Sequence, residues 1–128
     1  MRLHQVALPV GDLDRACAFY RDLLGCEPIA TFDPPGLVFF PLGETRLLLD
    51  RSSGSSALVY LQVDDVAAQV ETLRQRGVDV VEEPHVVFPD PDGVFGPAGQ
   101  DEWLAFVRDS EGNLLGLMNR APSAPSAP

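Results

Sequence analysis

The sequence contains no lysine. All nine of its basic residues are arginine, against 19 Asp and Glu, and the formal net charge is −10. An acidic field of this size repels the phosphates of nucleic acids and the headgroups of anionic lipids. We therefore expect neither a nucleic acid nor a membrane as a partner. The acidity mildly favours a cationic ligand, although chains are often acidic simply for solubility.

Long hydrophobic runs are also missing. The longest, such as LVFFPL and LAFV, are far too short to span a bilayer. The first residues, MRLHQV, lack the apolar stretch and small-residue cleavage site of a signal peptide. We therefore expect a cytoplasmic protein.

Cysteine is scarce. Cys17 and Cys26 do not have the spacing of a metal-binding or redox pair. Cys17 lies on an apolar helical stripe, where a cysteine behaves as a small buried hydrophobe. We expect both cysteines to be structural. The sequence also lacks a Ser–His–Asp or Cys–His arrangement, a phosphate-binding loop and a carboxylate pair fixed by spacing.

The first half predicts a strand, a helix and three more strands. LHQVALPV alternates like a strand with one buried face. Asp12 is placed to cap a helix that Gly25 ends, because the apolar residues between them recur at helical spacing. Three short strands are expected over 27–32, 37–42 and 45–51, separated by turn residues.

The same order is repeated after a Ser/Gly-rich connector at 51–57. An offset of 53 places Asp12 on Asp65, which again precedes an amphipathic helix and a glycine. Strands are expected over 78–87, 102–108 and 114–119, with DSEGN as a hairpin turn between the last two. The fold class is therefore α+β, with module 1 at about 1–51 and module 2 at about 57–120.

Both modules are expected within one domain, 1–121. The remaining residues, 122–128, are Pro/Ala/Ser-rich and are expected to be disordered. The stretch 88–102 is predicted to be irregular. A long irregular loop in a compact domain is often a lid or the rim of a site, and a surface insertion is the alternative.

The motif D-L-x-x-A-x-x-F-Y-x-x-L-L-G at 12–25, the restart at LQVDD and the turn DSEGN resemble the vicinal oxygen chelate superfamily. This superfamily includes glyoxalase I, bleomycin-resistance proteins, methylmalonyl-CoA epimerases and extradiol dioxygenases. The resemblance covers residues 1–119. It implies two βαβββ modules in a mixed sheet that curls around a concave pocket.

In the enzymes of this superfamily four side chains hold a divalent metal in the pocket. The resemblance places these positions on Gln5 rather than His4, on Leu58, on one of three leucines, and on Gly116; the three leucines are Leu47, Leu48 and Leu49. Leucine and glycine side chains offer no lone pair. We therefore expect no metal and no other cofactor. An unorthodox metal site remains an alternative, built from His4, Asp50, Glu82, Glu83 and His85.

Strand alternation and the resemblance together predict an apolar, aromatic ligand pocket. Its expected residues are Gln5, Ala7, Phe40 (with Phe39 as the alternative), Leu58, Tyr60, Gln62, His85, Leu104, Phe106, Gly116 and Met118.

The leading hypothesis is a metal-free protein that sequesters a small hydrophobic or aromatic molecule, as bleomycin-resistance proteins sequester a cationic drug. We expect no metal-dependent catalysis. One alternative is a metal-dependent lyase, isomerase or dioxygenase with displaced ligands. Another is a non-catalytic dimerisation module. Because members of the superfamily commonly dimerise, we expect a homodimer.

Overall fold

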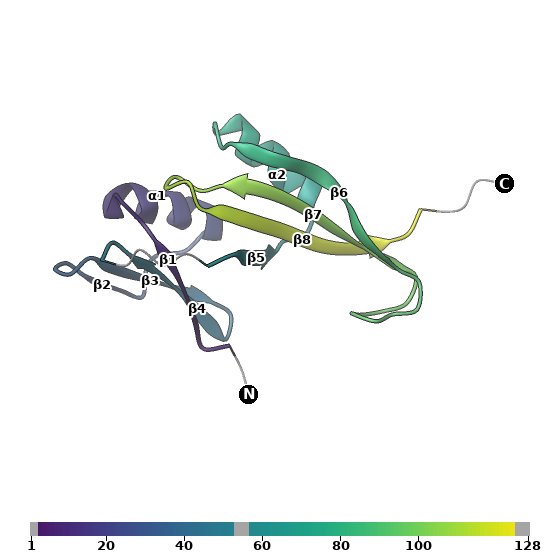
Figure 1. The fold of residues 1–128 in the computed structure, drawn as a ribbon, viewed down its shortest axis with the longest axis horizontal. Coiled ribbons are helices and arrows are strands. Elements are labelled where there is room, and N and C mark those ends of the chain that lie inside the picture. Colours follow the sequence, from purple (N-terminus) through teal and green to yellow (C-terminus); the bar gives the residue numbers. More distant parts are fainter. Residues whose placement is uncertain (1–2, 53–56, 125–128) are drawn as a thin grey trace. The chain divides into compact units, whose positions relative to one another are not determined.

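The strands form two four-stranded sheets, each accompanied by one helix (Figure 1). The computed structural model describes residues 3–52 and 57–124, so part of the 51–57 connector and the last four residues lie outside the described chain. The chain divides into two compact units, Met1–Val59 with Asp109–Asn113, and Tyr60–Arg108 with Leu114–Pro128. The DSEGN turn, expected in module 2, therefore belongs with the first unit.

The first unit has the predicted order of one strand, one helix and three strands. Its sheet has the strand order β1-β4-β3-β2. β1 runs parallel to β4, whereas β3 is antiparallel to both β2 and β4. The elements are β1 (Gln5–Pro9), α1 (Leu13–Leu24), β2 (Ala30–Phe32), β3 (Leu37–Leu42) and β4 (Thr45–Asp50).

Helix α1 begins and ends where the sequence predicts. The Asp12 carboxylate accepts a hydrogen bond from the Arg15 N–H at 2.9 Å. Gly25 ends the helix in the left-handed conformation, with φ 67°, which glycine adopts without a steric penalty. The buried face of α1 includes Tyr20, whose ring lies 6.4 Å from that of Phe40 on β3. The helix and the sheet share one apolar core.

The second unit repeats this order. Asp65 caps its helix, with the carboxylate accepting from the Ala68 N–H at 3.1 Å, and Gly77 follows the helix with φ 81°. The sheet has the strand order β5-β8-β7-β6, and β7 is antiparallel to both its neighbours. The elements are β5 (Val59–Gln62), α2 (Val66–Gln75), β6 (Val80–Asp90), β7 (Gln100–Arg108) and β8 (Leu114–Pro122). The paired βαβββ modules are thus confirmed, as two sheets instead of one curled sheet.

The stretch expected to be irregular, 88–102, is strand at both ends, over 88–90 and 100–102, and irregular between them. β6 and β7 continue as a long arm, and only residues 91–99 form its tip (Figure 1). Asp90 holds the tip: its carboxylate is 1% exposed and accepts from the Val94 N–H at 2.7 Å and the Phe95 N–H at 3.1 Å. Arg120 on β8 donates to the same carboxylate at 2.8 Å. The irregular part of the prediction thus holds for 91–99, and the buried Asp90 carboxylate bonds the start of this loop to Arg120.

The C-terminal strand is also longer than predicted. β8 continues to Pro122, which pairs with Gln100, where the sequence predicted the start of a disordered tail. The Ser123 N–H also bonds to the Gly99 carbonyl at 3.0 Å. Backbone hydrogen bonds to β7 therefore order residues whose composition predicted disorder. None of the helices in the described part of the chain is long and apolar enough to cross a membrane.

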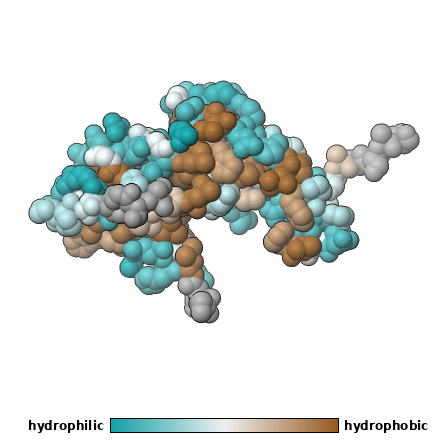
Figure 2. Space-filling view, in the orientation of Figure 1, coloured by the Kyte–Doolittle hydropathy of each residue, from teal (hydrophilic) through white to brown (hydrophobic). Residues whose placement is uncertain are grey.

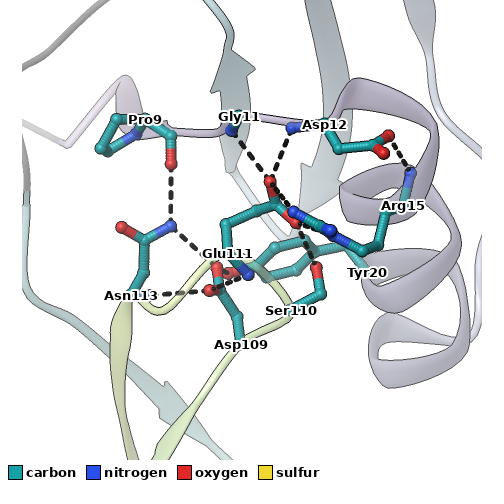
Figure 3. Close-up of polar contacts among 9 residues, drawn as sticks. All are labelled: Pro9, Gly11, Asp12, Arg15, Tyr20, Asp109, Ser110, Glu111 and Asn113. Atoms are coloured by element: carbon teal, nitrogen blue, oxygen red, sulfur yellow. Dashed lines mark hydrogen bonds and ion pairs between the residues drawn. The ribbon is translucent and has the colours of Figure 1, made fainter.

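The DSEGN turn is bound to the start of α1 through its side chains (Figure 3). The Glu111 carboxylate accepts from the backbone N–H groups of Gly11 and Asp12, at 2.8 and 2.7 Å, and from the Arg15 guanidinium at 2.7 Å. The Asn113 amide donates to the Pro9 carbonyl at 2.9 Å. These contacts join residues about a hundred positions apart in the sequence and explain why the turn belongs with the first unit.

Candidate functional site

The first sheet has one face toward α1 and a second face away from it, here called its far face. Phe40 lies on the helix face and is fully buried against Tyr20, so the prediction that it lines a pocket is wrong. A one-residue shift along a strand exchanges the two faces, and Phe39, the alternative, lies on the far face. The strand pairing places there Gln5, Ala7, Phe39, Arg46 and Leu48.

The register also separates the three leucines of β4 by the face on which they lie. Leu47 and Leu49 lie on the helix face, with exposures of 1% and 0%. Leu48 pairs with Ala7 and shares a face with Gln5. The Gln5 side-chain oxygen accepts a hydrogen bond from Arg46 Nε at 2.6 Å.

Arg46 is a functional candidate that the sequence did not indicate, and it lies beside Phe39, the alternative predicted for Phe40. The Arg46 guanidinium lies 5.5 Å from the centre of the Phe39 ring, a distance typical of cation–π contact. The sequence signal that could have indicated Arg46 is the alternation in TRLLLD. Alternation places Arg46 and Leu48 on the same face of their strand.

The far face of the second sheet collects most of the predicted pocket residues. The pairs Leu104–Met118 and Phe106–Gly116 lie side by side on β7 and β8. The Tyr60 ring from β5 stands 5.9 Å from the Phe106 ring, at an interplanar angle of 62°. This edge-to-face pair, with Gly116 between β5 and β7 in the sheet order, is here called the aromatic surface.

Tyr60 fills the space that a side chain at Gly116 would need. A Cβ atom built on Gly116 would lie 2.5 Å from Tyr60 Cδ1 and 2.9 Å from Cε1, well inside van der Waals contact. The ring itself is 51% exposed, so the aromatic surface has a free side.

Two other predicted pocket residues lie around β5. Gln62 lines a hollow of about 250 Å³ together with Tyr60 and Met118. Leu58 precedes β5 and is 50% exposed.

His85 makes its polar contacts along its own strand. It pairs in the sheet with Leu104. Its Nδ1 lies 2.8 Å from the Glu83 carbonyl oxygen, and its Nε2 lies 3.4 Å from the Glu82 carboxylate. This geometry fits a hydrogen-bonded surface histidine.

Another hollow of the second unit, of about 480 Å³, lies at the start of α2 and contains none of the predicted pocket residues. Its walls include Asp64, Asp65, Asp101, Trp103 and the end of β8. We place the candidate site on the aromatic surface instead, because there the exposed Tyr60 ring packs against the half-buried Phe106 ring beside several predicted pocket residues.

Metal-donor side chains are spread out over the described part of the chain. Within residues 3–52 and 57–124, no three His, Cys, Asp or Glu side chains gather in a way that could hold an ion. Asp50, one member of the alternative set, accepts from the N–H of Ser52 at 2.8 Å. Glu83 accepts from Arg74 at 2.6 Å.

Paired βαβββ modules, with a helix on one face of each sheet and aromatic side chains on the far face, define a protein of the glyoxalase type. Residues 2–117 match the model of the Glyoxalase/Bleomycin resistance protein/Dioxygenase superfamily, and the chain belongs to this superfamily.

Curated relatives include two kinds of enzyme. The chain is 30% identical to a lactoylglutathione lyase of Salmonella typhimurium, with 92% of each chain covered. It is also 30% identical to the mitochondrial methylmalonyl-CoA epimerase of Mus musculus, over 60% of this chain and 54% of that protein, so this match spans about half of the epimerase.

Solved structures agree with the fold. A lactoylglutathione lyase from Agrobacterium tumefaciens superposes with a TM-score of 0.68 at 26% identity, covering 91% of this chain and 92% of the other. A structure described as a conserved domain protein gives a TM-score of 0.70 at 19% identity over 92% of this chain and 97% of the other, which supports the fold alone.

Proposed function

We propose that this chain is a metal-independent member of its superfamily that binds a small hydrophobic or aromatic molecule on the aromatic surface of Tyr60 and Phe106. Binding would sequester the molecule, as a resistance protein does, without a chemical step.

The observation that carries this proposal is the contact between Tyr60 and Gly116. The resemblance assigns a metal-binding carboxylate to position 116, yet a Cβ there would lie 2.5 Å from the Tyr60 ring. A side chain at 116 and the present position of Tyr60 exclude each other. This exclusion supports a metal-independent role for the chain.

The other positions that the resemblance assigns to metal ligands argue the same way. Leu48 and Leu58 carry no donor atom. The Gln5 oxygen is engaged by the Arg46 guanidinium, and a cation beside this oxygen repels a metal ion. These side chains do not fit a divalent ion, which needs several oxygen, nitrogen or sulfur donors converging on one point.

The proposal is tested by metal analysis and by equilibrium binding. Protein purified without chelator should contain well under one equivalent of Ni, Zn, Mn or Fe. Aromatic probes, including cationic antibiotics and neutral aromatic metabolites, should bind at micromolar concentrations. Phe106→Ala should weaken this binding at least tenfold.

The matched control is Phe95→Ala, which removes an equivalent ring that is 67% exposed at the tip of the arm. It should leave the affinity unchanged. About one equivalent of tightly bound metal, or no probe binding below millimolar concentration, would contradict the proposal.

A metal-dependent lyase or epimerase is the second candidate, favoured by the similarity to the Salmonella typhimurium lactoylglutathione lyase over 92% of each chain. Lactoylglutathione lyase and methylmalonyl-CoA epimerase assays with added Ni²⁺ or Co²⁺ discriminate between the two candidates. Metal-stimulated turnover that Gln5→Ala abolishes would favour the enzyme.

A third candidate is dimerisation through the arm. β6 is an edge strand, and an edge strand offers unpaired backbone groups to another chain. Apolar side chains are exposed along it, namely Val81, Val86, Val87 and Phe88. Figure 2 shows hydrophobic atoms gathered at the tip of the arm, where Phe88 and Phe95 lie 5.3 Å apart. Light scattering should give twice the monomer mass, and Val87→Glu should reduce it.

A further inference from the structure

We propose a second binding site, on the far face of the first sheet, for a small monocarboxylate with an apolar body. Arg46 would bind the carboxylate, and the aromatic side chains of β2 and β3 would contact the apolar part. All of its residues lie in the first unit, so the inference does not depend on the aromatic surface of Tyr60 and Phe106.

Arg46 differs from other arginines of the chain in its partners. Five of them face a carboxylate within hydrogen-bond distance: Arg15, Arg21, Arg51, Arg74 and Arg120. Within the described residues, Arg46 has no acidic partner, and its one hydrogen bond is from Nε to the neutral amide of Gln5. A guanidinium carries five N–H donors, so the four on its two terminal nitrogens have no acceptor in the described chain.

Two contacts hold this guanidinium in place. The bond from Nε to the Gln5 oxygen measures 2.6 Å, and the guanidinium carbon lies 5.5 Å from the centre of the Phe39 ring. Phe39 in turn makes an edge-to-face contact with Phe32 at 6.0 Å. A positioned guanidinium loses little conformational entropy when it binds an anion.

The surface beside Arg46 is hollow and apolar. Ile29, Ala30, Phe32 and Phe39 line a depression of about 250 Å³ with Arg46 at its edge. Ile29 is 62% exposed and Phe32 is 53% exposed, although both are large apolar side chains. Sites for drug-sized ligands measure roughly 300–1,000 Å³. The depression therefore fits a smaller molecule, about one ring or one short branched chain in size.

The charges around this depression select the class of ligand. Two terminal guanidinium nitrogens match the two oxygens of a carboxylate as a bidentate pair. One positive charge in a chain of net charge −10 balances a singly charged acid but not a phosphate dianion. Gln5 is essential to this balance, because a glutamate at the same position would neutralise Arg46.

Titration calorimetry with three probes of nearly equal shape tests the proposal. These are phenylacetate, its neutral amide phenylacetamide and the cation phenethylamine. The wild-type chain should bind phenylacetate at least tenfold more tightly than either of the other two. The preference should weaken as the salt concentration rises.

Arg46→Gln should abolish the preference by removing the charge. Gln5→Glu should abolish it as well, by pairing Arg46 internally while keeping its hydrogen bond, and this variant guards against misfolding as the explanation. Arg76→Gln on the exposed end of α2 changes the net charge by the same amount and should keep the preference.

Equal binding of acid and amide, tighter binding of the cation, or no binding of phenylacetate would each overturn the proposal. So would a preference that survives in both Arg46→Gln and Gln5→Glu. The two proposals fail separately, because Phe106→Ala should weaken aromatic binding on the second sheet and leave the acid preference intact.

Discussion

The Tyr20 hydroxyl donates a hydrogen bond to the Asp109 carboxylate at 2.6 Å, joining helix α1 to the turn between β7 and β8 across 89 positions of sequence (Figure 3). Tyr20 is fully buried and Asp109 is 6% exposed. Burial and the Asp109 charge raise the pKa of the Tyr20 phenol, so it remains a donor at every physiological pH. The Asp109 carboxylate also accepts from the N–H groups of Glu111 and Asn113, at 2.8 and 2.7 Å.

Tyr20→Phe should destabilise the chain by about 1.5–3 kcal/mol, the usual range for a lost hydrogen bond to a charged group. The ring stays in the core, so packing against Phe40 is kept. Urea denaturation measures the change. Tyr60→Phe is the matched control, since that side chain is 51% exposed, and it should change stability by less than about 0.5 kcal/mol. A Tyr20→Phe protein as stable as wild type would contradict this account of the turn.

Glu111 should make the free energy of unfolding depend on pH in the acidic range. Its side chain is 2% exposed, and the Arg15 guanidinium, followed by the N–H groups of Asp12 and Gly11, lowers its pKa from 4.5 to about 2. A lowered folded-state pKa means that the stabilisation is complete above about pH 5 and is lost as the pH falls toward 2. The expected contribution at pH 7 is roughly 2–3 kcal/mol.

Glu111→Gln should therefore be less stable than wild type at pH 7 and should lose less stability between pH 5 and pH 2. Urea midpoints across this range measure both effects. Glu71→Gln, on an exposed helical ion pair with Arg74, should keep the wild-type slope. Parallel pH profiles for wild type and Glu111→Gln would rule out this role.

Asp90 should control local opening at the tip of the arm. Burial opposes its ionisation, but the N–H groups of Phe95 and Val94 and the Arg120 guanidinium outweigh burial and lower the pKa of Asp90. Asp90→Asn replaces one accepting oxygen with an amide that donates. Hydrogen exchange at the Val94 and Phe95 amides should become at least tenfold faster. Asp92→Asn at the exposed tip should leave exchange unchanged, and unchanged exchange in Asp90→Asn would contradict this role.

Gly116→Ala should displace the Tyr60 ring, because the added methyl would lie 2.5 Å from Tyr60 Cδ1. The expected cost is about 1–3 kcal/mol, typical of overpacking, with at least a threefold loss of aromatic-probe affinity. In a Tyr60→Ala background the same methyl should cost much less stability, so a double-mutant cycle isolates the contact. Equal costs in both backgrounds would show that Tyr60 does not fill this space.

Much of the candidate site could be predicted because alternation along a strand is a local property. Tyr60, Phe106 and Gly116 share a face, as their spacing predicts. The choice between Phe39 and Phe40 could not be made, since adjacent residues point to opposite faces and both are equally apolar. Arg46 was missed for a related reason: its importance depends on having no acidic partner, and pairing is decided by residues far apart in the sequence.

The sequence by itself determined the elements and their order. Helix capping by Asp12 and Asp65 and helix ending at glycine involve only neighbouring residues. These signals and their repetition can therefore be recognised in the sequence alone. Tertiary structure alone decided that strands β6 and β7 extend into both ends of 88–102. It also decided that Glu111 binds the start of α1 and Asp109 binds Tyr20 within that helix, and that Tyr60 occupies the space beside Gly116. Each of these depends on pairing or contact between segments far apart in the sequence. The secondary-structure propensities of single residues cannot predict such partners.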